Sequence, residues 1–344
     1  MEYRAAAKEI GKGIFKPVYV CCGSEPHLIQ EFIRYLADKW LAPEEREFAV
    51  SRYDLAETPL EAVLEDAQTA PFFGARKLIV ADNAAFFTAA RDGEAAEQAV
   101  DGLIRFLAAP ADVSVTVFIV PGDKLDERRK IVKAARRADA VVEFPAMNDA
   151  DLAHWLRRQA DRRGIRFSGA AAEKLLILCG GNLQLVAGEL DKLALAAGTG
   201  GTVDEAAVER LVSRTAEQNV FLLVDELARQ RLDRALDIYR DLLVQKEEPV
   251  KLLALIAGEI RLMLLAKSLA SRGMGTGAIA ARLNAKPFRV RKALEHASRF
   301  ETERLARALS RLAELDYAMK AGLADKALAL ELFMMELIAR KDPA

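Results

Sequence analysis

Cysteine and histidine are scarce in this sequence, with three of each among 344 residues. Three cysteines cannot form a disulfide framework, and such sparing use is typical of proteins of the reducing cytoplasm. His27, His154 and His296 are isolated from one another, and none lies at zinc-ligand spacing with a cysteine or another histidine. We therefore expect a cytoplasmic protein that has no metal site and no cofactor.

Long apolar runs are also absent. No segment approaches the roughly eighteen uninterrupted apolar residues of a transmembrane helix, so we expect no contact with a membrane. The opening residues, MEYRAAAKEIGKGIF, lack the long apolar run and the small-residue cleavage site of a signal peptide. The net charge of −1 excludes a general electrostatic attraction to nucleic acid, so any such binding must come from local patches.

Strand-like and helix-like segments alternate over residues 1–145. Apolar runs predict strands at 18–22, 48–53, 77–82, 113–120 and 140–144. Amphipathic or capped segments predict helices up to residue 40, from residue 58, at 94–108 and at 124–137. Ser24 and Thr58 are the predicted N-caps of the first two of these helices. The alternation indicates βαβ units and a largely parallel sheet, which makes this part of the chain α/β.

After Pro145 the pattern is entirely helical. Asn148 and Ser168 are the predicted N-caps of two helices. Further helices are expected at 183–196, 205–214, 219–229, 232–245, 250–271, 277–283, 287–298, 302–320 and 326–340. We therefore predict an α/β domain at 1–145, a small helical domain at 146–215 and a helical bundle at 216–344.

The turn after the first strand lacks the residues of a phosphate-binding loop. Such a loop needs successive glycine amides, a lysine for the phosphates and a hydroxyl for Mg²⁺. The segment Cys22-Gly23-Ser24-Glu25-Pro26-His27 has one glycine, an acidic residue, a proline without an N–H and no lysine. The third strand ends in Asp82-Asn83, without the second acidic residue that would position water for hydrolysis. We expect no nucleotide-binding site and no catalytic residues.

Two adjacent phenylalanines lie on the turn Pro71-Phe72-Phe73-Gly74, between a predicted helix and the third strand. Proline ends the helix, and glycine relaxes the backbone after the aromatic pair. One interpretation is that both rings cap the core of their own sheet, since phenylalanine is usually inside. The other is that the pair is held out as an apolar plug for a partner protein.

Basic residues are concentrated at 124–137, where seven lysines and arginines occur. Arg129, Lys133, Arg136 and Arg137 share one face of the predicted helix. A solvated helix face explains this pattern, because charged residues normally lie outside. Contact with DNA phosphates is the alternative, and it would make binding strongly dependent on salt. Residues 285–311 are similarly basic, with eight lysines and arginines against three acidic residues.

Five groups of residues, in the same order along the chain, resemble the delta subunit family of bacterial DNA polymerase III. They are Pro17 to Leu28, Ala70 to Leu78, Lys124 to Lys130, Gly181-Asn182-Leu183 with Glu189 to Leu193, and Pro287 to Val290 with Leu315 to Gly322. In that family they correspond to a degenerate phosphate loop, a clamp-binding element, a K-L-D-x-R-x-K segment, a small-domain signature and a helical collar. The likeness covers nearly the whole chain.

The resemblance implies an AAA+-like sheet domain, a three-helix lid and a C-terminal collar that serves oligomerisation. It implies a subunit that does not use ATP itself and that joins delta prime and gamma/tau in a hetero-pentamer, as part of the DNA-directed DNA polymerase III holoenzyme. This subunit would bind the β sliding clamp and open its ring so that primed DNA can enter. Ala70, Pro71, Phe72 and Phe73 occupy the clamp-binding element, with the phenylalanines as the wedge. Ala70 is small where relatives place a larger apolar residue.

An ATP-using AAA+-type enzyme, or a nucleotidase, with an atypical phosphate site remains an alternative. Glu25 would repel a phosphate, and Pro26 offers it no amide. Asn83 is a poor substitute for an acidic residue that positions water. These three residues argue against the enzyme, and a titration with nucleotide separates the two hypotheses.

Overall fold

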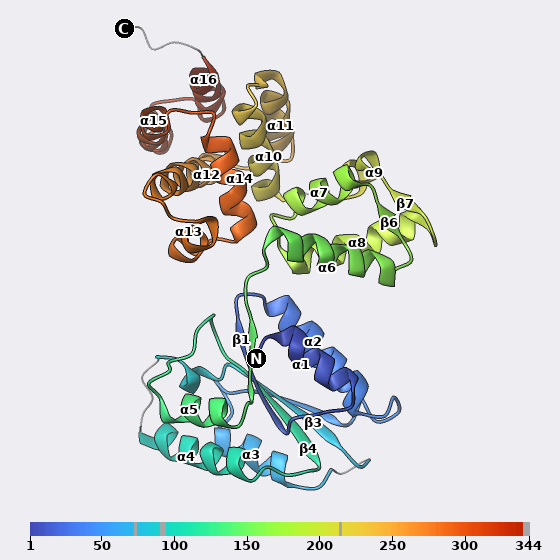
Figure 1. Ribbon diagram of the computed structural model, residues 1–344. Helices are drawn as coiled ribbons and strands as arrows, with labels where there is room; N and C mark the ends of the chain where they lie inside the picture. Colours follow the sequence, from blue (N-terminus) through green and yellow to red (C-terminus); the bar gives the residue numbers. More distant parts are fainter. Residues whose placement is uncertain (72–73, 90–93, 213–214, 340–344) are drawn as a thin grey trace. The chain divides into compact units, whose positions relative to one another are not determined.

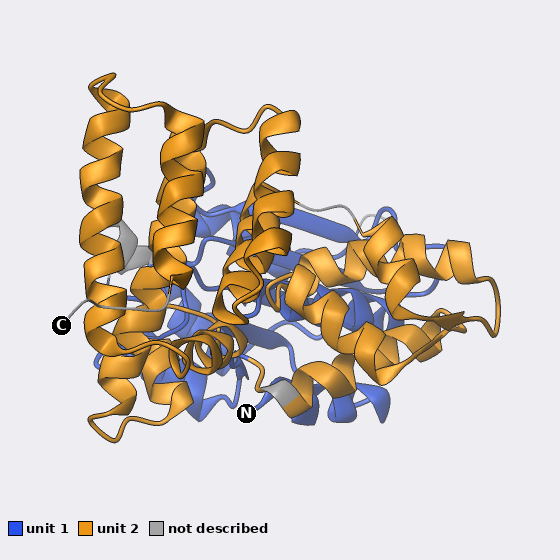
Figure 2. Ribbon diagram, turned by 90° about the horizontal axis from the view of Figure 1, so that it is seen from above, with its two compact units in different colours: residues 1–146 blue, residues 147–344 orange. Residues whose placement is uncertain are grey.

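The computed structural model describes residues 1–71, 74–89, 94–212 and 215–339 (Figure 1). The chain divides into two compact units, Met1–Ala146 and Met147–Ala344 (Figure 2). The first unit contains the large sheet, and the second is built mainly of helices. The predicted boundaries between three domains remain a prediction.

A five-stranded parallel sheet forms the centre of the first unit, with strand order β2-β3-β4-β1-β5. Its strands are β1 (Val18–Gly23), β2 (Val50–Asp54), β3 (Lys77–Asp82), β4 (Ser114–Ile119) and β5 (Val141–Phe144). Strands β1, β3 and β4 are buried almost throughout, whereas the edge strand β2 is partly exposed along its whole length. Continuous apolar runs are typical of parallel strands that are covered on both faces.

Helices cover both faces of this sheet (Figure 1). They are α1 (Tyr3–Gly11), α2 (Pro26–Trp40), α3 (Leu60–Gln68), α4 (Glu94–Ala108) and α5 (Lys130–Arg137), together with the short 3-10 turn η1 (Ala85–Phe87). Helices α1 and α2 lie on one face, and α3, α4 and α5 lie on the other. The α/β fold class predicted for this part of the chain is confirmed, although the sequence analysis did not predict α1 or η1.

Three local predictions in this unit are wrong. Glu25, not Ser24, is the N-cap of α2, and Pro59, not Thr58, is the N-cap of α3; neither helix has a side-chain cap. Helix α5 begins at Lys130 instead of residue 124, because Asp126 organises the preceding residues into a turn. The carboxylate of Asp126 accepts hydrogen bonds from the backbone N–H of Arg128 at 3.1 Å and from its Nε at 2.8 Å. Such Asx turns compete with helix formation.

The second unit opens with four helices and a short parallel ladder. The elements are α6 (Asp149–Arg162), β6 (Arg166–Phe167), α7 (Gly169–Leu178), α8 (Leu183–Ala197), β7 (Thr202–Val203) and α9 (Glu205–Leu211). Asn148 and Ser168 accept hydrogen bonds from the backbone N–H groups of Asp151 and Ala171, so both predicted N-caps are confirmed. The strands β6 and β7 were not predicted, because each is only two residues long.

The rest of the second unit is a helical bundle around one hydrophobic core. Its helices are α10 (Ala216–Ala228), α11 (Leu232–Val244), α12 (Pro249–Ala270), α13 (Thr276–Leu283), α14 (Pro287–Ala297), α15 (Thr302–Lys320) and α16 (Lys326–Ile338). Helix α12 packs against α10, α13, α14, α15 and α16. The predicted succession of an α/β part and an all-α part is therefore confirmed. Among the described residues, no helix is both long enough and apolar enough to span a membrane.

Candidate functional site

The segment that resembles the clamp-binding element connects α3 to β3. Ala70 and Gly74 are exposed, and Pro71 is half-buried. Gly74 has a φ of +78°, a conformation that favours glycine and ends the turn. Phe72 and Phe73 lie outside the described residues. What the structure defines is how the chain is held on either side of this pair.

Lys77, the first residue of β3, follows the segment in sequence, and its side chain binds the end of α3, which precedes the segment. Its side chain is buried, with 5% of the residue exposed. The ammonium donates hydrogen bonds to the backbone carbonyl of Asp66, to Asp66 Oδ1 at 2.9 Å and to Thr69 Oγ1 at 3.0 Å. The hydroxyl of Tyr53 donates to Asp66 Oδ2 at 3.0 Å. These bonds tie the last turn of α3 to the beginning of β3.

The charge of Asp66 is favoured by this arrangement. Burial alone would raise the pKa of the Asp66 carboxyl, but hydrogen bonds from Lys77 and Tyr53 and the positive charge of Lys77 outweigh it. The net result is a pKa below the usual value for aspartate. A carboxyl whose folded pKa is depressed stabilises the fold above its unfolded pKa, and this contribution is lost as the pH falls through the folded pKa.

The C-terminal side of the segment is held by the end of α2 and the turn that follows it. The guanidinium of Arg76 lies 4.2 Å from the centroid of the Trp40 ring, a cation–π contact. Trp40 Nε1 donates to the carbonyl of Lys77 at 3.1 Å. A Cβ placed on Gly74 would lie 2.5 Å from Cδ of Glu45, and the φ of +78° at this position also favours glycine. The described residues on both sides of Phe72 and Phe73 are therefore held by contacts with neighbouring elements.

The corner where a phosphate loop would lie is occupied by the chain's own groups. A cavity of about 390 Å³ opens there, lined in part by Gly23, Arg136 and Glu143. Arg136 forms ion pairs with Glu127 at 2.8 Å and with Glu143 at 2.7 Å. A Cβ on Gly23 would lie 2.1 Å from the carbonyl oxygen of Phe144, so this glycine permits the close approach of β1 and β5. Its role is in packing the sheet.

The end of β3 is engaged in a similar way. Asp82 accepts a hydrogen bond from Arg52 Nε at 2.7 Å. Asn83 donates from Nδ2 to Asp54 Oδ1 at 2.8 Å. In the part of the chain that the structure describes, no cluster of three or more metal-ligating side chains occurs. The side chains at this strand end are therefore engaged within the chain, and the absence of nucleotide binding remains a prediction.

The four basic residues proposed for DNA contact are not equivalent. Arg129 precedes α5, and its Nη1 donates to the carbonyl of Phe86 at 2.7 Å. Arg136 is held by its two carboxylate partners. Lys133 and Arg137 are exposed on α5. The structure thus places three of the four residues on the helix, and contact with DNA remains a prediction.

Two of the motifs that carried the resemblance meet in the second unit. Gly181, with a φ of +67°, lies against Phe288: a Cβ placed on this glycine would be 3.3 Å from Cβ of the phenylalanine. Lys286 Nζ donates to the carbonyl of Gly181 at 3.4 Å. Nearby, the buried Lys292 of α14 forms an ion pair with Glu173 of α7 at 3.3 Å. Helices α7 and α14 are therefore joined by apolar and polar contacts.

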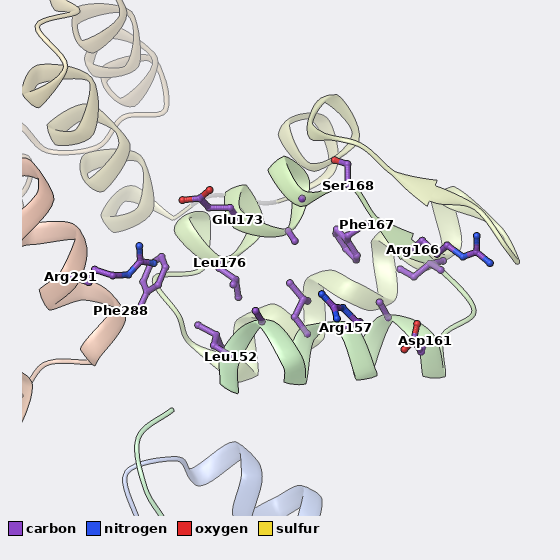
Figure 3. Close-up of a pocket in the computed structure, with 16 residues that line it drawn as sticks. Leu152, Arg157, Asp161, Arg166, Phe167, Ser168, Glu173, Leu176, Phe288 and Arg291 are labelled. Atoms are coloured by element: carbon purple, nitrogen blue, oxygen red, sulfur yellow. The ribbon is translucent and has the colours of Figure 1, made fainter. Parts of the chain in front are cut away.

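A cavity of about 790 Å³ lies beside this junction (Figure 3). Leu152 of α6 and Leu176 of α7 line it together with Phe288 of α14. Sequence reasoning missed this cavity, because its lining comes from segments more than a hundred residues apart. The sequence showed that each helix has apolar residues, but it did not show that these helices pack beside one another.

The first unit is thus built on a parallel α/β sheet, and the second is built mainly of helices. A family model described as DNA polymerase III, delta subunit matches residues 19–145, and one described as DNA polymerase III delta subunit, C-terminal domain matches residues 217–337. A DNA polymerase III subunit delta of Bacillus subtilis (strain 168) is 35% identical over 335 residues, which is 97% of this chain and 96% of that protein.

The solved structure of a Bacillus subtilis DNA clamp loader delta protein is also similar. It superposes with a TM-score of 0.75 at 34% identity, covering 98% of this chain and 99% of the other. The chain therefore belongs to the DNA polymerase III delta subunit family. The family resemblance is confirmed, as is the fold class predicted from the sequence, an α/β part followed by an all-α part.

We predict that Lys77→Met lowers the free energy of unfolding by about 1–3 kcal/mol at pH 7, because Asp66 loses its charged partner. Urea denaturation of parent and variant measures this difference. It should shrink below about pH 5, as protonation of Asp66 removes the same interaction from the parent. Lys8→Met, at an exposed position of the same unit, is the control and should change stability by less than about 0.5 kcal/mol. Equal stability of Lys77→Met and parent at pH 7 would contradict the assigned role.

We also predict that the isolated protein does not bind ATP. Isothermal calorimetry with Mg²⁺–ATP at micromolar protein should give only the heat of dilution, because the turn after β1 has neither the lysine nor the successive glycines of a phosphate-binding loop. Stoichiometric binding would favour the alternative of an ATP-using enzyme.

Proposed function

We propose that this chain is the clamp loader subunit that binds the β sliding clamp and opens its ring for loading onto primed DNA. Membership of the delta subunit family supports the proposal. The observation that carries it is that the residues matching the clamp-binding element lie between two fixed ends, beside which Ala70, Gly74 and Arg76 are exposed. Ala70, Pro71, Phe72 and Phe73 are the proposed contacts.

Opening the clamp requires only a difference in affinity. A protein that binds the open ring more tightly than the closed ring shifts the population by that difference alone. Burial of two phenylalanines contributes about 1.5–3 kcal/mol each, which is sufficient to bias a strained interface. Because we expect no nucleotide to bind this chain, the proposed step consumes no ATP on this subunit.

The fixed ends of the segment matter for affinity. A loop that is ordered only on binding loses conformational entropy at that moment, which weakens the complex. Lys77 and Arg76 hold the chain on one side of the segment's tip, and the last turn of α3 holds it on the other. We infer that this anchoring reduces the entropic cost of presenting the segment to the clamp.

Assembly with the other loader subunits is proposed to occur through residues 216–344, the collar. Leu328, Leu332 and Met335 of α16 form an exposed apolar stripe with helical spacing, although α16 also buries Phe333 and Leu337 in the bundle. Exposed apolar surface of this kind is typical of protein–protein contacts. Delta prime and gamma/tau are the proposed partners in a hetero-pentamer, and ATP bound to those subunits would control exposure of the clamp-binding segment.

Contact with primed DNA is proposed for the assembled loader. Arg129, Lys133, Arg136 and Arg137 are the candidate phosphate contacts. The exposed Lys133 and Arg137 are the stronger candidates, since Arg129 and Arg136 already have partners within the chain. A phosphate contact by either residue would add to the salt dependence of DNA binding.

We predict that the double variant Phe72→Ala, Phe73→Ala loses clamp affinity by about a hundredfold or more, because two aromatic contacts of at least 2 kcal/mol each are removed. Surface plasmon resonance with purified β clamp measures the change. The variant should melt within a few degrees of the parent and still join the other subunits. If the rings instead form part of the sheet's own core, each substitution should cost about 3–5 kcal/mol of stability. Unfolding, or unchanged affinity, would refute the wedge assignment.

We predict that the double variant Leu328→Asp, Leu332→Asp weakens assembly with delta prime and gamma/tau at least about tenfold, since charge is placed in a desolvated apolar contact. Co-purification and analytical ultracentrifugation measure assembly. Clamp binding by the isolated variant should be unchanged. Leu195→Asp, at a highly exposed position of α8, is the matched control and should assemble normally. Normal assembly of the double variant would show that α16 is not the interface.

A further inference from the structure

Phe48 is exposed in a way that is unusual for an aromatic residue. It lies in the turn between α2 and β2, and 70% of its surface is accessible. Val50, two residues later at the start of β2, is also exposed. Phenylalanine is normally among the most buried residue types, so an exposed ring next to a second exposed apolar side chain calls for an explanation.

This turn runs beside the C-terminal end of the clamp-binding segment. The carbonyl of Ala49 accepts a hydrogen bond from the backbone N–H of Leu78 at 2.8 Å, which joins the start of β2 to β3. The backbone N–H of Phe48 donates to the carbonyl of Glu45 at 3.1 Å. The carboxyl of Glu45 in turn lies against Gly74. Phe48 is therefore three residues from a direct contact with the segment.

The surroundings of Phe48 resemble the edge of a binding surface. Strand β2 is at the edge of the sheet, so no strand covers it on its outer side within the described part of the unit. Glu44 and Glu47, which are close to Phe48 in the sequence, are exposed, and Arg46 is paired with Asp38 at 2.8 Å. An apolar centre bordered by charged side chains is the usual composition of a protein–protein contact.

We propose that Phe48 is an additional contact for the β sliding clamp, outside the family's clamp-binding element. Together with Val50 it places exposed apolar surface on the turn beside Gly74. The inference rests on the proposed function, because it assumes that the clamp docks on this side of the sheet. It gives a role to an aromatic residue of which 70% is accessible.

The test compares the affinity of the full chain for purified β clamp in four proteins: the parent, Phe48→Ala, Ile14→Ala and the double variant Phe72→Ala, Phe73→Ala. We expect Phe48→Ala to weaken binding about tenfold with an unchanged melting temperature, as is typical of an aromatic contact near the border of an interface. Ile14 is an exposed apolar residue in the loop that follows α1, in the same unit. The Ile14→Ala variant should bind like the parent.

The outcomes separate this inference from the proposed function. Parent-like affinity of Phe48→Ala, with loss in the double variant, overturns the inference and leaves the proposed function intact. Parent-like affinity of the double variant as well overturns both. Equal weakening in Ile14→Ala would also overturn the inference, because the effect would not be specific to the turn.

A second measurement covers the case in which Phe48→Ala is unstable. The native cysteines, Cys21, Cys22 and Cys179, are all buried, and burial raises the pKa of each thiol, so a maleimide dye reacts mainly at an introduced exposed thiol. A polarity-sensitive dye on Phe48→Cys should shift its emission to shorter wavelength when the clamp is added, whereas a dye on Ile14→Cys should not. An unshifted spectrum at saturating clamp would overturn the inference.

Discussion

The candidate site depends on one buried positive charge, the ammonium of Lys77. Taking a charge out of water is unfavourable unless hydrogen bonds replace the lost hydration. Here a carboxylate, a backbone carbonyl and a hydroxyl replace it, and all three belong to the last turn of α3 or to the residue that follows it. If the end of α3 moved away from the start of β3, the buried ammonium would lose these hydrogen bonds, which is unfavourable. The two ends are therefore held together. The exposed segment between them inherits its position from this constraint.

A second feature of the sheet bears on the proposed function. Gly23 approaches Phe144 closely, and Arg136, with its two ion pairs, lines the cavity at the corner where phosphates would be held. With Asp82 engaged by Arg52, the neighbouring strand end is also committed to internal contacts. In the proposed function, the free energy that opens the clamp then comes from binding alone. This agrees with a subunit that binds a strained conformation of its partner and does not use ATP to produce it.

Patterns that depend on near neighbours were predictable from the sequence. The bounds of β3 and α4 were predicted correctly, as were the caps Asn148 and Ser168, because apolar runs and capping side chains act within a few residues. The start of α5 was not, since the turn made by Asp126 competes with the helix. Contacts such as Trp40 with Lys77 and Arg136 with Glu143 join separate elements, so no local pattern reveals them. Whether Phe72 and Phe73 face outward could not be decided from pattern, and both lie outside the described residues.

The junction between α7 and α14 has a mechanical consequence. Gly181, in the loop after α7, lies directly against Phe288. Lys292 forms ion pairs with Glu173 at 3.3 Å and with Glu295 at 3.0 Å. A hinge at this point would have to open an apolar contact and separate the buried ammonium of Lys292 from its carboxylate partners. Both changes are unfavourable. We therefore expect α7 and α14 to move together, and bending within this unit to occur elsewhere.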